Sequence, residues 1–429
     1  MTTGRDFEAE LEAAGRAMEA KCKATDNGLE DRLADKPNEE WQKAGAALDQ
    51  PTNAWVRPFQ WRDPSTIPCR EWLYGRHYVR RFISATFAPG GVGKSSLVLT
   101  EALAMASGKP LLGTVPKRRL KIACWNGEDP FEETERRAAA AASHYGLGAA
   151  DLEGWLFLGS GRDVPLVLAE QQASGTVILA PNVERVLEAV RDFGLDVIII
   201  DPFVSSHRAS ENDNNAIDIV VKEWARIADR ANISIELVHH TRKANGSETT
   251  VEDGRGASAL LYAARSARVL NVMSKDEAQR AGVERHRSYF RVDSGKSNMT
   301  LAPEGSDWFH MISVDLDNGD ALNEGDHVGV VTRWSWPDPF DGVSVSDLYA
   351  VQKAIDGGRW RENSQAVEWV GKAVAEVLGL DLDDKADKQK VKGLLATWTK
   401  NGALVRVTAT DDKSRPRPVV AVGKWAVVG

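Results

Sequence analysis

The glycine-rich run Ala88-Pro-Gly-Gly-Val-Gly-Lys-Ser95 constrains the fold of this chain more than any other segment. A β-strand-like stretch precedes it at 80–87, and an apolar, helix-like stretch follows at 95–107. A glycine-rich turn between a strand and a helix lets backbone N–H groups close around phosphate oxygens, and the helix dipole favours the same anion. The spacing matches a P-loop, with Ala88 where the first glycine usually stands. The run therefore predicts a nucleotide site.

The predicted phosphate-binding residues are those of the run and one further serine: Ala88, Pro89, Gly90, Gly91, Val92, Gly93, Lys94, Ser95 and Ser96. In such a site Lys94 contacts the β- and γ-phosphates, which makes it a catalytic as well as a binding residue. Ser95 is expected to hold Mg²⁺ together with Asp201, which ends the apolar stretch 195–201. We therefore expect ATP and Mg²⁺ as ligands.

Strand-like and helix-like stretches alternate through the middle of the chain. Strands are expected at 80–87, 120–129, 195–201 and 233–240, and helices at 95–107, 129–146 and 214–231. This alternation indicates a mainly parallel sheet flanked by helices. Three later stretches, 268–274, 287–295 and 308–316, have no helix between them, so we expect antiparallel strands at one edge.

The second predicted strand ends in Asn126-Gly-Glu-Asp-Pro130. A carboxylate at this position can activate the water that attacks the γ-phosphate. We expect Glu128 to do this, while Asp129 caps the following helix with Pro130 at its first position. The alternative is that both acidic residues only cap the helix.

Composition excludes several classes of protein. The net charge of −8 argues against a protein that is basic throughout and coats nucleic acid. The three cysteines, Cys22, Cys69 and Cys124, form no CxxC pair, which argues against a disulfide framework and a zinc ribbon. No stretch approaches the length of an apolar membrane span, and the charged N-terminus does not resemble a signal peptide. A cytoplasmic location without membrane association is expected.

The chain is predicted to contain three parts. Residues 1–54 comprise a short amphipathic helix at 5–24 and a polar, flexible linker at 25–54. Residues 55–325 form the nucleotide-binding domain. Residues 340–429 form a second domain with helices at 344–356, 364–379 and 388–402, followed by strands at 403–410 and 419–428.

Three helices and a hairpin are typical of a winged-helix domain. Between residues 385 and 424 the chain has 10 basic and 3 acidic residues. The basic residues expected on the third helix and the turn are Lys388, Lys390, Lys392, Lys400, Lys413, Arg415 and Arg417. They could contact phosphates of duplex DNA, or they could be the solvated face of a protein-interaction module. Four tryptophans of this domain are expected in its core: Trp360, Trp369, Trp398 and Trp425.

The ordered set APGGVGKS, NGEDP, DVIIIDPF, ELVHHTRK, GRGASALLYAARSAR and DSGKSNM resembles the RepA-like hexameric replicative helicases. These are RecA-fold AAA family ATPases of plasmids and phages, and the resemblance covers about residues 65–315. It implies a RecA-like core in which Glu128 is the catalytic glutamate. Arg137, or in its place Arg136, would lie near the γ-phosphate. His240 would sense that phosphate, with His239 facing the opposite side of its strand.

The resemblance also implies a homo-oligomer, expected to be a hexamer, with each ATP site completed by an arginine from the next subunit. Arg268 is the first choice for that arginine and Arg265 the second. Lys296 and Asn298 resemble a Lys-x-Asn element near the same interface, where Lys296 would reach the nucleotide. The alternative for these four residues is surface ion pairing.

In the RecA fold the segment corresponding to 241–258 lines a central channel and meets single-stranded DNA. Arg242 and Lys243 would contact DNA phosphates there, or they are solvated loop charges. The expected function is a DNA-dependent ATPase, a ring-forming helicase or translocase in replication or recombination of a mobile element. The alternatives are a RecA-type recombinase or mediator without unwinding, and a DNA-binding initiator or regulator switched by ATP.

Overall fold

The computed structural model describes residues 55–427, apart from 242–247, 254–256, 301–304 and 411–415. The predicted helix at 5–24 and linker at 25–54 lie outside the described residues. The chain divides into two compact units, residues 1–69 and 70–429. The described part of the first unit contains a 3-10 helix, η1 (Pro64–Thr66), which Asp63 caps by accepting the Ser65 N–H.

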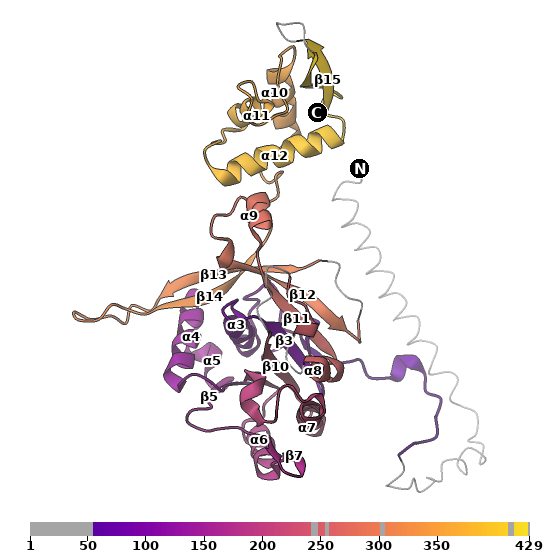
Figure 1. Ribbon diagram of the computed structural model, residues 1–429, viewed down its shortest axis with the longest axis vertical. Coiled ribbons are helices and arrows are strands. Elements are labelled where there is room, and N and C mark those ends of the chain that lie inside the picture. The colour runs from indigo at the N-terminus through magenta and orange to yellow at the C-terminus, as the bar shows by residue number, and fades with distance from the viewer. Residues whose placement is uncertain (1–54, 242–247, 254–256, 301–304, 411–415, 428–429) are drawn as a thin grey trace, which may run out of the picture. The chain divides into compact units, whose positions relative to one another are not determined.

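A nine-stranded sheet forms the centre of the second unit, with the order β14-β13-β12-β11-β3-β10-β8-β4-β5 (Figure 1). The six strands from β11 to β5 pair in parallel, and β12, β13 and β14 continue the sheet in antiparallel fashion. The strands are β3 (Ile83–Ala88), β4 (Ile122–Asn126), β5 (Leu156–Ser160), β8 (Val197–Asp201), β10 (Ser234–His240), β11 (Ser266–Val272), β12 (Tyr289–Ser297), β13 (Asp307–Asp315) and β14 (His327–Trp334).

The predicted edge of the sheet was partly wrong. β11 is parallel to β3, because α8 (Ala257–Ala263) lies before it and allows the chain to cross over. Only β12 and the strands after it are antiparallel. The predicted domain end at residue 325 is also wrong, since β14 follows that position and pairs with β13 along its whole length.

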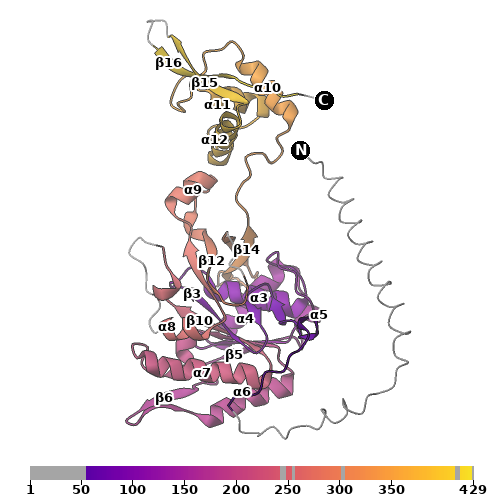
Figure 2. The same cartoon turned by 90° about the vertical axis from the view of Figure 1, so that its right-hand side faces the viewer.

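Helices cover both faces of the parallel strands, as Figures 1 and 2 show. Apolar side chains of α6, α7 and α8 pack on one face of β3, β8 and β10, and those of α3 and α4 pack on the other. The helices of this domain are α3 (Lys94–Ser107), α4 (Phe131–His144), α5 (Ala149–Leu152), α6 (Ala180–Phe193), α7 (Asn214–Ala231), α8 and α9 (Lys275–Ala281). The predicted α/β architecture with a mostly parallel sheet is confirmed.

Short elements fill the connections. They are β1 (Trp72–Tyr74), β2 (Tyr78–Val79), β6 (Ala169–Gln172), β7 (Gly175–Ile178), β9 (His207–Arg208), η2 (Phe203–Ser206), η3 (Val251–Asp253) and η4 (His286–Ser288). Because the six central strands run in one direction, their carboxyl ends meet at one edge of the sheet. Loops at that edge are where α/β proteins place their ligand sites.

The C-terminal elements have a hydrophobic core of their own, which includes Val351, Leu394 and Leu404. They are α10 (Val345–Ile355), α11 (Val370–Leu378), α12 (Lys385–Lys400), β15 (Leu404–Thr410) and β16 (Pro416–Val422). Three helices followed by a hairpin agree with the predicted order, although α11 begins at residue 370 and not at 364. The winged-helix assignment itself stays a prediction.

The tryptophans of this domain do not all lie in its core. Trp369 and Trp398 are buried, and Trp360 packs against the core as a partly buried side chain. The prediction for Trp425 was wrong: β16 ends at Val422, so Trp425 follows the strand and is 41% exposed.

Candidate functional site

The turn between β3 and α3 lies at the carboxyl end of β3 and has open space beside it. Gly91 and Gly93 have φ angles of 84° and 110°, in the left-handed region that favours glycine. A Cβ atom at Gly93 would lie 2.5 Å from Cε of Met311, whereas one at Gly90 or Gly91 would meet no atom within 4 Å. The turn can therefore admit a phosphate next to its backbone.

Lys94 and Asp201 come from distant parts of the sequence and meet beside this turn. The Lys94 ammonium nitrogen lies 3.6 Å from Oδ1 of Asp201 and 3.5 Å from Oγ of Ser95. Lys94 and Asp201 are 8% and 6% exposed, so both charges are largely shielded from water. The lysine of the turn and the aspartate of β8 are thus brought together, as the sequence predicts.

A small pocket next to Lys94 carries polar groups that suit a nucleotide phosphate and a divalent cation. Its polar lining consists of Ser95, Asn126, Thr134, Arg137 and Asp201. The Thr134 hydroxyl is buried and has no hydrogen-bond partner among the described residues, so a donor is left for a ligand. Hydroxyl and carboxylate oxygens are ligands that Mg²⁺ prefers, which makes Ser95 and Asp201 the fitting pair. When bound, Mg²⁺ would neutralise phosphate charge.

The loop after β4 places Glu128 at the same edge of the sheet. Asn126 lies opposite Asp201 in the parallel register, and the Gly127 N–H donates to the Asp201 carbonyl at 2.9 Å. The Asn126 side-chain oxygen accepts the N–H of Glu128 at 2.8 Å, and Arg162 donates to the Glu128 carbonyl at 2.6 Å. The backbone of Glu128 is therefore fixed from two sides, while its side chain is exposed to solvent.

The predicted role of Asp129 as a helix cap was wrong. Pro130 is itself the N-cap of α4, and no side chain accepts a capping hydrogen bond there. The Asp129 carboxylate instead pairs with Arg137, at 2.8 Å between Oδ2 and Nη1. The Asn126 side-chain oxygen accepts the Asp129 N–H at 2.7 Å, which fixes the backbone of the turn just before α4.

Arg137 and Arg136 point to different places, although they are neighbours on α4. Arg137 lines the pocket with Ser95 and Asp201, and it is held by Asp129 and, through Nε at 3.0 Å, by Glu133. Arg136 pairs with Asp326, just before β14, at 3.1 Å. Of the two arginines, only Arg137 is placed to reach a phosphate.

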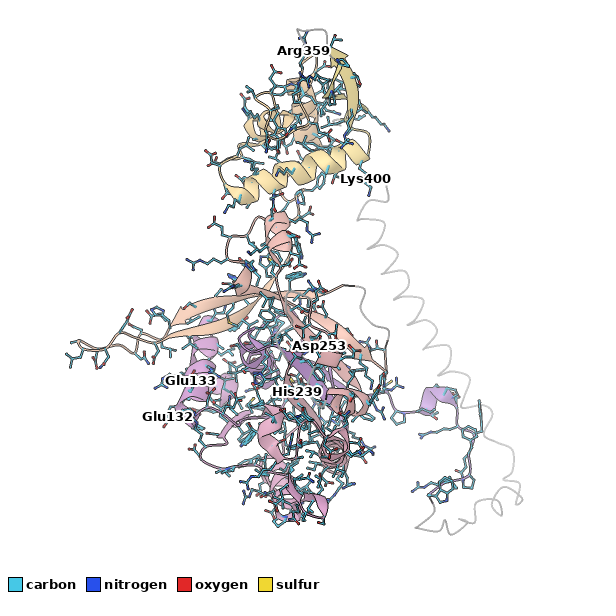
Figure 3. All side chains as sticks on the ribbon, in the orientation of Figure 1. Glu132, Glu133, His239, Asp253, Arg359 and Lys400 are labelled. Carbon is cyan, nitrogen blue, oxygen red and sulfur yellow. The ribbon has the colours of Figure 1, made fainter. Side chains whose placement is uncertain are left out.

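The two histidines at the end of β10 face opposite sides of the sheet, as strand alternation predicts. His239 lies within the core (Figure 3). Its ring packs against Phe87 and Phe203. Burial lowers the pKa of His240, and Lys94 lowers it further, while Glu128 acts in the opposite direction. His240 is therefore within electrostatic reach of both Lys94 and Glu128, as a residue that senses the nucleotide would be.

The prediction that Arg268 reaches into a neighbouring subunit was wrong. Arg268 is 9% exposed, and its guanidinium binds Glu101 of its own chain at two points, 2.7 and 2.6 Å. Burial works to lower the pKa of Arg268, but the charge of Glu101 outweighs it and raises that pKa above the ordinary value. An arginine held in this way cannot serve another subunit.

Arg265, the second choice, is exposed at the start of β11. Two neighbours lie beside it: Lys296 donates to the carbonyls of Leu261 and Tyr262 at the end of α8, and the Asn298 N–H donates to the Arg265 carbonyl at 3.3 Å. Burial lowers the pKa of Lys296, and Arg265 lowers it further. The Lys-x-Asn element and Arg265 thus form one group, and Lys296 does not line the pocket at Lys94 of its own chain.

The segment predicted to meet DNA, 241–258, is hydrogen bonded to strands of the sheet at its first residue, Thr241, and again at Thr249. Arg242 and Lys243 lie outside the described residues. Before them, the Thr241 N–H donates to the carbonyl of Ala88 at 3.0 Å. After them, the backbone of Thr249 is held by the side chain of Asn271, which accepts its N–H at 2.8 Å and donates to its carbonyl at 3.0 Å.

Only some of the described basic side chains of the C-terminal domain are exposed and could contact DNA phosphates. The Lys390 ammonium donates to the Asp341 carbonyl at 2.6 Å. Lys400 is exposed at the end of α12 (Figure 3), and Lys388 and Lys392 are half-buried on the same helix. Lys413 and Arg415 lie outside the described residues, and Arg417 is exposed on β16.

Sequence reasoning missed three residues of the site. Asn126 could have been found, because an asparagine before Gly-Glu-Asp is typical of a turn in which the side chain accepts backbone N–H groups. Thr134 could have been placed on the face of α4 that Arg137 shares, since helical residues three apart are neighbours. Arg162 follows β5 and has no local sequence signal that connects it to Glu128.

Comparison with known families agrees with this geometry. Residues 51–246 match the model of a family described as an AAA domain. The match includes the turn at Lys94, the Glu128 loop, Asp201 and His240. The chain therefore carries a P-loop ATPase domain, a class of domain that binds and hydrolyses ATP and generally uses Mg²⁺. None of the helices in the described ranges is long and apolar enough to cross a membrane.

The different positions of the two arginines on α4 generate a prediction. Arg137→Ala should lower kcat for ATP hydrolysis about tenfold to a hundredfold, because a positive charge next to the phosphates is lost. Arg136→Ala is the matched control and should stay within about twofold of wild type, because its partner is Asp326. Phosphate release measured without DNA checks both variants. An equal loss in the two variants, or none in Arg137→Ala, contradicts the placement of Arg137 at the nucleotide.

Proposed function

We propose that this protein is a DNA-dependent ATPase that works as a ring of identical subunits, expected to be a hexamer, and moves along or unwinds DNA in replication or recombination of a mobile element. One observation carries the proposal. The turn that would hold the phosphates is hydrogen bonded, through Ala88 and Thr241, to the beginning of the segment expected to meet DNA. A change at the γ-phosphate could thus reach that segment over one residue, because His240 precedes Thr241.

The proposed chemistry uses the residues around the pocket. Lys94 and the N–H groups of the turn bind the β- and γ-phosphates of ATP, and Ser95 and Asp201 would hold Mg²⁺. Glu128 accepts a proton from the attacking water, for which an exposed carboxylate on a fixed backbone is suited. Arg137 stabilises the charge that develops on the phosphate.

Oligomerisation supplies the remaining charge in this proposal. Arg265 is exposed and lies next to Lys296, whose ammonium holds the end of α8 in place. An exposed arginine on a rigid support is suited to reach the γ-phosphate in a neighbouring subunit. With Arg268 held by Glu101, Arg265 is the arginine that we assign to this role.

The C-terminal domain is proposed to bind duplex DNA through phosphate contacts. Lys388, Lys392 and Lys400 lie on α12, the third helix, and such contacts give affinity without reading sequence. The order of three helices and a hairpin supports this winged-helix-like role. Lys390 is not included, because its ammonium is already bonded within the domain.

The dependence of ATP hydrolysis on DNA tests the proposed function. Hydrolysis should be slow without DNA, rise at least about tenfold with single-stranded DNA, and be abolished in Lys94→Ala under all conditions. Steady-state phosphate release with no DNA, single strands and duplex measures this, with Lys117→Ala as the control for an exposed lysine of the same domain. Hydrolysis that does not respond to DNA contradicts a motor and favours the ATP-switched initiator or regulator.

A strand-displacement assay then separates a helicase from a recombinase or mediator. ATP-dependent displacement supports the helicase, and DNA-stimulated hydrolysis without displacement supports the recombinase or mediator.

Mixing two inactive variants tests the shared site. Arg265→Ala and Lys94→Ala should each be inactive alone. In an equal mixture with random assembly, up to about a quarter of the ATP sites should be complete, so hydrolysis should return to at most about a quarter of the wild-type rate. The reason is that Lys94→Ala subunits still offer Arg265 to the intact turn of an Arg265→Ala subunit. Phosphate release by the mixture is the measurement.

The control mixture combines Lys94→Ala with Glu128→Ala, in which neither subunit has an intact nucleotide side, and it should remain inactive. If the Arg265→Ala mixture also stays inactive although size measurements show mixed oligomers, Arg265 does not act across subunits.

A further inference from the structure

A group of buried charged residues lies inside the ATPase domain, deeper in the sheet than the nucleotide pocket. Glu101 on α3, Glu236 on β10 and Arg268 on β11 are 5%, 0% and 9% exposed. The residues that contact them are also mostly buried, and include Thr86 on β3 and His77 beside β2. The pocket at Lys94 does not include any of these five side chains.

Arg268 joins three elements through its guanidinium. Its two terminal nitrogens donate to the two carboxylate oxygens of Glu101, at 2.7 and 2.6 Å, and its Nε donates to the Thr86 hydroxyl at 2.8 Å. Tyr78 donates to the same Glu101 carboxylate at 2.7 Å. A two-point contact of this kind fixes the orientation as well as the distance of the two side chains.

Glu236 joins β10 to β3. Its carboxylate accepts hydrogen bonds from the hydroxyls of Ser84 and Thr86, and Nε2 of His77 lies 2.9 Å from it. Burial works to raise the pKa of Glu236, but His77 and then Arg268 outweigh it, and that pKa is held below its ordinary value. Glu236 is therefore a carboxylate inside the sheet. Because Thr86 contacts both Glu236 and Arg268, the two halves of the cluster are connected.

Three elements of this cluster, β10, β3 and α3, also carry a residue of the nucleotide site. Glu236 is on the same face of β10 as His240, about 13 Å along the strand. Thr86 is followed on β3 by Ala88, where the phosphate-binding turn begins. Glu101 follows Lys94 by two turns of α3, about 10 Å along the helix. The cluster thus sets the relative positions of the strand that carries His240 and the strand and helix that carry the turn.

Stability alone is a weak reason for such a cluster. Buried ion pairs lose hydration, and well-packed apolar residues in their place are often as stable or more stable. What the cluster adds to the backbone pairing of the strands is directional contact between side chains of neighbouring elements, which apolar side chains do not make.

We propose that Glu236, Thr86 and Arg268 are positioning residues for ATP hydrolysis, which hold His240 and the phosphate-binding turn in the relative geometry that the reaction needs. The proposal rests on the ATPase activity of the domain and is independent of DNA. These residues do not touch the nucleotide, so their loss should affect the reaction more than nucleotide binding.

The test compares Glu236→Gln, which keeps the size of the side chain, and Thr86→Val, which keeps its shape and removes the hydroxyl shared by Glu236 and Arg268. Without DNA, kcat should fall at least about tenfold in each variant, while the Kd for a fluorescent ATP analogue stays within about threefold of wild type. Asp196→Asn is the matched control. Asp196 and Arg80 form a partly buried ion pair, 2.7 Å long, just before the amino ends of β8 and β3, whereas the nucleotide site lies at the carboxyl ends of these strands.

Asp196→Asn should lower the Tm and leave kcat for ATP hydrolysis within about twofold of wild type. The proposal is overturned if folded Glu236→Gln and Thr86→Val have a lower Tm but an unchanged kcat, as the control does. It is also overturned if kcat and the affinity for the analogue decrease by the same factor. If Glu236→Gln does not fold, Thr86→Val decides alone by the same criteria. Because all assays omit DNA, a failure of DNA stimulation does not affect the result.

Discussion

The approach of Lys94 to Asp201 across the sheet is the interaction on which the site depends. The two residues come from β8 and from the turn after β3, and β10 lies between these strands. Only strands that run in the same direction bring their carboxyl ends to one edge, so the parallel pairing of the six central strands is required for this contact. The apolar helices on both faces stabilise that pairing by burying both sides of the strands.

The side chains proposed to act on ATP also lie at this edge of the sheet. The register of β4 against β8 places Asn126 opposite Asp201, and from there the Glu128 loop is held by the side chains of Asn126 and Arg162. β10, which lies between β3 and β8, contributes His240. The site is therefore assembled from the ends of neighbouring strands, and side chains on α4, above all Arg137, close it from one side. A buried cluster of charges further down the same strands gives that assembly a fixed geometry.

Many helices and strands could be predicted from the sequence, because their hydrophobic patterns and end signals are local. The apolar stretch 195–201 and the helix at 214–231 have strong patterns, and β8 and α7 agree with them to within two residues. The helix α6 was missed, although Pro181 near its start and Gly194 at its end are ordinary helix signals. Strand β14 was not predicted, and it begins two residues after the predicted domain end at 325.

The predictions that failed depend on side-chain partners that the pattern around each residue does not show. Asp129 has the sequence context of a helix cap, but Arg137 on the next turn of α4 competes for its carboxylate. Arg268 was chosen as an interface arginine because of its neighbours in the sequence, whereas Glu101, 167 positions earlier, holds it inside the domain. No local pattern reveals Glu101 as the partner of Arg268, since that contact is set by how α3 packs on the sheet.

The central claim is that these strand ends form a site for ATP hydrolysis in which Glu128 activates water. Single-turnover hydrolysis and binding of a fluorescent ATP analogue by Glu128→Gln test it most directly, with Glu132→Gln, an exposed neighbour on α4, as the control (Figure 3). We expect Glu128→Gln to bind the analogue within about threefold of wild type but to hydrolyse ATP at least about a hundredfold more slowly. Hydrolysis by Glu128→Gln at the rate of the control would contradict it.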